Sequence, residues 1–401
     1  MIARRQEEIC VSSHFLTGVA FTVTVILVKK YLSSLLHSWK GSYDMPHTTI
    51  QSITVEPLTI PLLEPFTIAT GSVSEARNVL ITVTLRDGSV GYGECAPFPP
   101  STGESQETAL AAARGCIELL RGQDASSWRV LSKLIHSVYY AQTTVCAGME
   151  MAIFDALTRS YSLPLYVFFG GTSTSVETDM SIPMVTPEHA YELAQDTVKR
   201  GITRIKIKVG GDLREDVDRV EAVRGGAPQL GIILDANQGY TPSQALLCLE
   251  ALDDRDIRPL LMEQPVHKDD YEGLRYITQH TTVPIAADES ASNAAAVARL
   301  IKMGAINVVN IKLMKAGIVE ALDIAALCRV HHIGLMIGAM IESRLAIAAA
   351  AHFAAGLGGF SFIDLDTPML LAEDPFTGGY EQRGGIYDVS GVKSGLGIER
   401  N

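Results

Sequence analysis

The sequence predicts an α/β protein, a TIM-like barrel of seven or eight β/α units with an N-terminal α+β capping domain that the C-terminal tail completes. Short apolar, β-branched runs end on charged residues, and stretches of helical period separate them. The charged residues recur every 24 to 28 residues from Lys208 to Lys312, and Asp364 follows 52 residues later. A strand, a turn and a returning helix need about this length, and their repetition builds a parallel barrel.

The first 47 residues differ from the rest of the chain. Arg4 and Arg5 precede an apolar stretch, residues 11–28, which two lysines close. Its length approaches the roughly 20 residues that cross a bilayer. We interpret it as a signal anchor or membrane helix, which would tether the catalytic part. A cleaved organelle-targeting segment and an extension without a role in the mature protein are the alternatives.

Residues 48–170 predict the capping domain. Apolar and polar residues alternate from 50 to 97, and Asp87 and Gly88 between two such runs indicate a hairpin. Residues 105–165 are rich in alanine and leucine with helical spacing. The barrel is expected at 171–374. The glycine-rich tail, 375–401, has short strand patterns and is expected to return to the capping domain.

Composition indicates which partners and which cellular compartment suit the chain. The 401 residues include 33 basic and 45 acidic side chains, a net charge of −12, with no basic stripe, so we exclude nucleic acid as a partner. The six cysteines have no metal-ligand spacing and fit buried free thiols. This predicts a reducing, cytoplasm-like compartment for the catalytic part. We also expect a homo-oligomer.

Three acids, Asp235, Glu263 and Asp288, each close one of three successive predicted strands. The carboxyl ends of all barrel strands meet on one face, so these side chains are expected side by side. Oxygen ligands without His or Cys suit Mg²⁺, and we predict one ion per subunit. The alternative is that the acids cap the following helices or pair with lysines.

Lysines enter the same cavity from two sides. Lys206 and Lys208 are two apart on a strand and so project to the same, inward side, while Lys312 comes from well round the ring. A metal between two opposed lysines suits removal of a proton α to a carboxylate, with an enediolate stabilised by the metal. Burial, a neighbouring ammonium and the metal are together expected to lower the lysine pKa. The alternative is that these lysines neutralise the acids. Lys315 is expected outside, at the following turn.

Asp364 and Asp366 fall on the same side of the last predicted strand. Two buried carboxylates are unfavourable unless a cation meets them. A substrate ammonium group is the expected cation, and Lys206 is the less favoured internal partner. Ordinary polarity at the barrel end is the alternative.

These motifs resemble the muconate-lactonizing subgroup of the enolase superfamily. The resemblance covers residue 48 to the C-terminus and is carried by GYGECAP in the capping domain and by KIK, LDANQG, MEQP, ADES, NIKLMKAG and DLDTP in the barrel. Enzymes of this superfamily use a lysine or histidine base with one or two Mg²⁺ ions, so the resemblance by itself implies this chemistry. DLDTP is similar to the segment with which dipeptide epimerases of the Ala-Glu type hold the ammonium group of their substrate.

The resemblance implies a role for each matched residue. It implies Mg²⁺ ligands at Asp235, Glu263 and Asp288, acid/base catalysts at Lys208 and Lys312, and an assisting lysine at Lys206. It implies substrate contacts at the remaining matched positions, Ser181, Met340, Glu342, Asp364 and Asp366.

One position departs from the family. Thr70 stands in the mobile loop of the capping domain, where Ala-Glu epimerases often carry an arginine. This points to small or apolar second residues in the substrate. The expected reaction is epimerisation of an L-Ala-Xaa dipeptide at its C-terminal residue by two-base 1,1-proton transfer. An o-succinylbenzoate synthase, a cycloisomerase and a non-catalytic, membrane-tethered binding protein are the alternatives.

Overall fold

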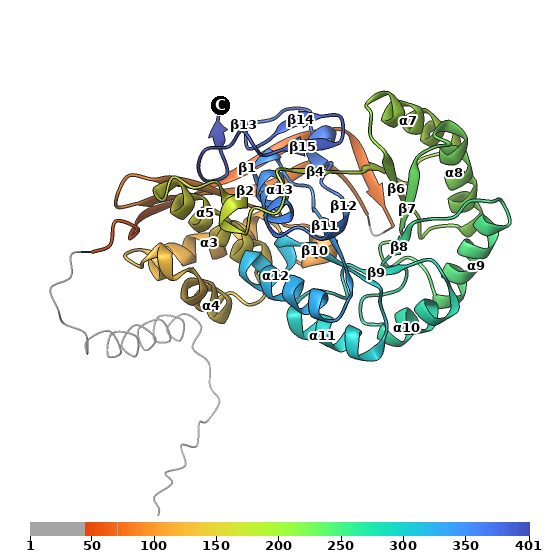
Figure 1. Ribbon diagram of the computed structural model, residues 1–401, viewed down its shortest axis with the longest axis horizontal. Coiled ribbons are helices and arrows are strands. Elements are labelled where there is room, and N and C mark those ends of the chain that lie inside the picture. The colour runs from red at the N-terminus through yellow and green to blue at the C-terminus, as the bar shows by residue number, and fades with distance from the viewer. Residues whose placement is uncertain (1–44, 70) are drawn as a thin grey trace, which may run out of the picture. The chain divides into compact units, whose positions relative to one another are not determined.

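The computed structural model describes residues 45–69 and 71–401 (Figure 1). The apolar stretch 11–28 and Cys10 lie outside these residues. Within the described ranges, no helix combines the length and apolar character needed to cross a membrane. The five cysteines that are described are free and buried, as predicted.

The capping region is built on a three-stranded antiparallel sheet in the order β1-β2-β3. Its long first hairpin pairs Ile50 with Leu85 at one end and Ile68 with Gly71 at the other. The predicted turn at Asp87 and Gly88 joins β2 to β3. Ser105 caps α3 in a reciprocal capping box with Thr108. The elements are β1 (Ile50–Ile68), β2 (Gly71–Leu85), β3 (Val90–Cys95), α2 (Pro99–Thr102), α3 (Gln106–Leu120), η1 (Ala125–Ser127), α4 (Trp128–Val138), α5 (Thr143–Ser160) and α6 (Leu165–Phe168).

Eight parallel strands form the barrel, in the order β12-β11-β10-β9-β8-β7-β6-β5. The two edge strands meet through a hydrogen bond from the Asp179 N–H to the Ile363 carbonyl (2.9 Å). The strands are β5 (Met180–Ile182), β6 (Arg204–Lys208), β7 (Gly231–Asp235), β8 (Leu261–Glu263), β9 (Ile285–Ala287), β10 (Val308–Lys312), β11 (Gly334–Gly338) and β12 (Phe360–Ile363).

A helix follows each of the first seven barrel strands, and Figure 1 shows α7 to α11 along the outside of β6 to β9. This alternation of parallel strands and returning helices confirms the predicted fold class. The helices are α7 (Pro187–Lys199), α8 (Leu213–Gly226), α9 (Pro242–Asp253), α10 (Tyr271–His280), α11 (Ala294–Met303), α12 (Leu313–Val330) and α13 (Arg344–Leu357).

Apolar side chains fill the barrel beneath its charged end. Ile233 and Leu261 lie two residues before Asp235 and Glu263, so they point to the same inward side. They pack in one buried cluster with Ala286, Val308 and Met336. The charged face is therefore the upper surface of a solid core, as in other barrels of this type.

The C-terminal tail returns to the capping region. The Leu396 N–H donates to Asp155 Oδ1 on α5 (2.7 Å), and Arg400 forms an ion pair with Glu56 on β1 (2.7 Å). We propose the division into 48–170 plus 375–401 and 171–374 for the folded chain on the strength of these contacts. η2 (Thr367–Leu370) precedes the tail. The tail contains β13 (Phe376–Gly378), β14 (Glu381–Arg383), β15 (Ile386–Asp388) and β16 (Ile398–Arg400), and β15 pairs with β4 (Ser175–Glu177).

Candidate active site

The charged residues stand at the carboxyl ends of the barrel strands. Lys208, Asp235 and Glu263 are the last residues of β6, β7 and β8, and they lie level in the sheet register. Lys312 ends β10, and Asp288 and Asp364 follow β9 and β12 directly. The regular spacing in the sequence therefore corresponds to one ring of charge, as expected.

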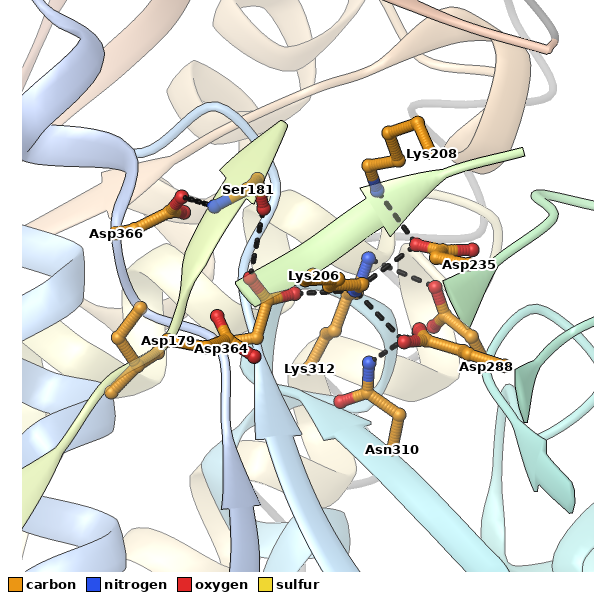
Figure 2. A network of polar contacts seen from close by, with 12 residues as sticks. Asp179, Ser181, Lys206, Lys208, Asp235, Asp288, Asn310, Lys312, Asp364 and Asp366 are labelled. Carbon is orange, nitrogen blue, oxygen red and sulfur yellow. Dashed lines mark hydrogen bonds and ion pairs between the residues drawn. The ribbon is translucent and has the colours of Figure 1, made fainter. Parts of the chain in front are cut away.

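Lys206 lies at the centre of this ring and is fully buried (Figure 2). Its Nζ is 2.6 Å from Asp364 Oδ2, 2.8 Å from Glu263 Oε2 and 3.0 Å from Asp235 Oδ2. Burial opposes the charge, but the three carboxylates outweigh burial and hold the pKa of Lys206 well above its ordinary value. The expectation that Lys206 is a minor partner of Asp364 was wrong.

Lys208 and Lys312 come from opposite sides of the barrel. Three strands separate β6 from β10 in either direction round the ring. Lys208 Nζ lies 2.6 Å from Asp235 Oδ2, and Lys312 Nζ lies 2.9 Å from Asp288 Oδ2. Burial lowers the pKa of Lys312, but Asp288 raises it further, so that its pKa lies above the ordinary value. The expected fall in the lysine pKa relied on the metal as well as on burial and a neighbouring ammonium, and burial and Lys206 by themselves do not outweigh Asp288.

Asp235, Glu263 and Asp288 are fully or almost fully buried and each has an ammonium partner. Among residues 45–69 and 71–401, no three His, Cys, Asp or Glu side chains are gathered as a ready-made metal cluster. Glu263 Oε2 nevertheless has no hydrogen-bond donor, because Lys206 approaches it without hydrogen-bond geometry. Burial and Asp235 raise the pKa of Glu263 to about 7. This set of hard oxygen ligands, with one oxygen of Glu263 left without a hydrogen bond, fits Mg²⁺ in kind.

A second acidic group closes the ring at β5 and β12. Asp366 Oδ2 accepts the Ser181 N–H (2.6 Å), and the Ser181 hydroxyl lies 3.5 Å from Asp364 Oδ1. Burial and the neighbouring Asp364 raise the pKa of Asp366 to about 6. Asp179, two residues before Ser181, is also buried, and neither of its carboxylate oxygens has a hydrogen-bond partner. This side of the site has an excess of carboxylates.

One cavity is lined by residues of both charged groups. Its floor is polar, and the capping region contributes mainly apolar side chains to its walls. The Phe66 ring lies 5.9 Å from Lys208 Nζ, so the capping region covers this lysine. The lining residues are Phe66, Ile68, Phe98, Ser101, Ser181, Lys208, Asn237, Lys312, Ala339, Met340, Ile341, Asp364, Asp366 and Thr367.

The expected contact residues divide into three groups. Ser181 and Met340 line the cavity. Glu342 does not; its carboxylate is buried and accepts the Met340 N–H (2.8 Å), so it acts on the loop that carries Met340. Thr70 lies outside the described residues.

The predicted position of Lys315 was wrong. We expected it outside the barrel, yet it is buried and its Nζ lies 2.6 Å from Asp288 Oδ1. The side chain reaches inward because α12 is broken two residues later, at Gly317, whose φ is 76°. Periodicity alone gives no sign of that break.

Sequence reasoning also missed two asparagines. Asn310 donates to Glu263 Oε1 (2.7 Å), and Asn237 lines the cavity with a buried, unpaired Oδ1. Asn310 precedes Lys312 by two residues on β10, so the period of the strand would have placed it inside. Asn237 follows β7 with a φ of 39°; it lies within the LDANQG motif, in which only Asp235 was given a role.

Comparison with known proteins places the chain in a family. Residues 49–170 match the N-terminal domain of mandelate racemase and muconate lactonizing enzyme, and residues 189–401 match the enolase C-terminal domain-like family. The chain is a member of the mandelate racemase/muconate lactonizing family of the enolase superfamily. It is an isomerase of the racemase and epimerase class.

Three relatives illustrate the likeness. An aromatic dipeptide epimerase of Herpetosiphon aurantiacus is 44% identical over 88% of this chain and 99% of that protein. An L-Ala-D/L-amino acid epimerase of Populus trichocarpa is 42% identical over 85% of this chain and 83% of that protein. A solved dipeptide epimerase of Enterococcus faecalis V583, complexed with Mg and L-Leu-L-Tyr, is 34% identical with a TM-score of 0.85, covering 88% and 100% of the two chains.

Proposed function

We propose that this enzyme is a Mg²⁺-dependent dipeptide epimerase that inverts the α-carbon of the C-terminal residue of L-Ala-Xaa. The observation that carries the proposal is the position of Lys208 and Lys312, which reach one cavity from opposite sides of the barrel. One lysine can take the α-proton from one face while the other returns a proton to the opposite face. That sequence inverts the carbon.

Asp235, Glu263 and Asp288 are the residues that would hold Mg²⁺, at one ion per subunit. The ion would supply electrostatic stabilisation of the charge that develops on the substrate carboxylate when the α-proton leaves. A lysine acts as base only in its neutral form. Mg²⁺ would offset the negative charge of the carboxylates that raise the pKa of Lys312. This would lower that pKa and favour release of the lysine proton.

Asp364 and Asp366 support a dipeptide over other substrates of this family. They line the same cavity as the two lysines, on the side that has more carboxylates than ammonium groups. The free ammonium group of a dipeptide would restore the balance there. Substrates of an o-succinylbenzoate synthase or a cycloisomerase have no ammonium group, so they leave this pair without a role.

The walls support an apolar second residue. Phe66, Ile68 and Phe98 of the capping region line the cavity opposite the carboxylates. Burial of an apolar side chain against them is favourable by about 25 cal/mol per Å². The name of one relative, the aromatic dipeptide epimerase of Herpetosiphon aurantiacus, agrees with this preference. The predicted membrane tether rests on residues 11–28, outside the described residues, and the homo-oligomer stays a prediction.

Solvent exchange tests the proposal. Each epimer of an L-Ala-Xaa library, incubated with the enzyme and Mg²⁺ in D₂O, should gain one deuteron at the α-carbon of the second residue and equilibrate with the other epimer. Mass spectrometry and chiral chromatography measure the two events. A chelator should stop both. Mg²⁺ binding without exchange on any dipeptide would favour a non-catalytic binding protein and contradict the proposal.

A further inference from the structure

Lys315 is a buried lysine that the proposed mechanism does not use. Its ammonium group donates to Asp288 Oδ1 (2.6 Å), to the Asp288 main-chain carbonyl and to the Asn310 carbonyl (2.9 Å). These three acceptors match the three donors of an ammonium group. Lys312 takes the other oxygen of the same carboxylate, Asp288 Oδ2. The Asp288 side chain is therefore held at both oxygens.

The backbone around Gly317 and its contact with the capping region determine the position of Lys315. Gly317 breaks α12 with a left-handed φ of 76°, and the helix restarts with the Val319 N–H donating to Glu150 Oε2 (2.9 Å). Glu150 is a buried carboxylate of the capping region, and its other oxygen contacts His136 (3.1 Å). The first turn of α12 is thereby turned inward, so that Lys315 faces Asp288.

Lys315 also connects two of the proposed metal ligands. It binds Asp288 directly, and it binds the main chain of Asn310, whose side chain donates to Glu263 Oε1 (2.7 Å). Figure 2 shows Asn310 beside this part of the network. One ammonium group thus fixes Asp288 and, through Asn310, the orientation of Glu263.

We propose that Lys315 is a positioning residue for the metal site, which fixes the Asp288 carboxylate relative to Glu263. This inference rests on the proposed function, because it takes Asp288 and Glu263 as Mg²⁺ ligands. Lys315 does not line the cavity and is given no part in proton transfer. Outer residues that orient metal ligands are commonly worth about 10- to 100-fold in metal affinity.

If Lys315 acted only through its charge, its replacement would change the affinity for Mg²⁺ in the opposite direction. Removing one positive charge beside Asp288 increases the net negative charge that attracts Mg²⁺, and so would tighten binding. Loss of orientation would weaken binding. The direction of the change therefore separates a positioning residue from a mere counter-charge.

The experiment is calorimetric titration of the full-length, metal-free enzyme with Mg²⁺. We compare the wild type, Lys315→Met, Lys315→Gln and the control Lys302→Met, which removes an exposed lysine of α11. Glutamine removes the charge but keeps a hydrogen-bond donor. We expect Kd for Mg²⁺ to rise about 10- to 100-fold in Lys315→Met, to rise less in Lys315→Gln, and to stay unchanged in Lys302→Met.

Equal or tighter Mg²⁺ binding in both Lys315 variants would overturn the inference. If Lys315→Met does not fold, as judged by loss of a cooperative thermal transition, Lys315→Gln decides by the sign of its change. Failure of the proposed function looks different, because the wild type itself would then bind no Mg²⁺, which would remove the basis of both proposals.

Discussion

At the scale of single residues, the site is a balance of buried charges. Lys206 is paired with three carboxylates, and Lys208 and Lys312 with one each, whereas Asp366 contacts only a main-chain N–H. A buried carboxylate without a cation is costly, so Asp366, which lines the cavity, would gain from a substrate ammonium group. The shift of its pKa to about 6 by burial and Asp364 reflects that deficit.

Replacement of Asp366 by asparagine should therefore reduce selection for a free amino group. A hydrogen bond to a charged group is worth about 1.5–3 kcal/mol, so kcat/KM for an L-Ala-Xaa dipeptide should fall about 10- to 100-fold. Activity on the N-acetylated dipeptide, which we expect to be weak in the wild type, should change little. Steady-state kinetics with both substrates measures the ratio.

Asp269→Asn, at an exposed position, is the matched control and should leave both activities unchanged. An equal loss on the free and the acetylated dipeptide in Asp366→Asn would show that this carboxylate does not recognise the ammonium group.

At the scale of elements, the strand ends were predictable and one helix start was not. Short apolar runs ended by Lys208, Asp235, Glu263 and Lys312 define β6, β7, β8 and β10 as expected, because the period of the barrel repeats in the sequence. The position of Lys315 depends on the break at Gly317 and on the contact between Val319 and Glu150, which are 169 residues apart in the chain. A contact of that range leaves no mark in local periodicity.

Alanine at position 317 should be destabilising. The left-handed φ of 76° disfavours any Cβ by about 1–2 kcal/mol, and this Cβ would lie 2.6 Å from Glu150 Oε2. We expect a loss of about 2 kcal/mol or more in the free energy of unfolding, seen as a lower Tm in differential scanning calorimetry.

Gly391→Ala serves as the comparison, because a Cβ there meets nothing within 4 Å and the residue is exposed. Its effect should remain within about 0.5 kcal/mol. Equal stability of the two variants would mean that the break in α12 does not depend on glycine.

At the scale of the whole molecule, the capping region and the barrel complete the site together. Glu94 on β3 accepts from the Ser343 N–H (3.0 Å) and the Ala346 N–H (3.2 Å) at the start of α13, and Asn78 donates to the Ile341 carbonyl (2.8 Å). Both capping residues thus hold the loop that brings Met340 and Ile341 into the cavity wall. The sequence predicted that a capping domain exists, but these contacts join residues about 250 positions apart and had no local signal.

The two-base claim is tested most directly by single-base variants. Lys208→Ala and Lys312→Ala should each lose net epimerisation, because inversion needs a proton donor and a proton acceptor on opposite faces. The lysine that remains can still remove a proton from its own face. In D₂O, one variant should therefore exchange the α-hydrogen of one epimer only, and the other variant that of the opposite epimer. If both variants exchange the same epimer, or if either still epimerises at the wild-type rate, these lysines do not act from opposite faces of one carbon.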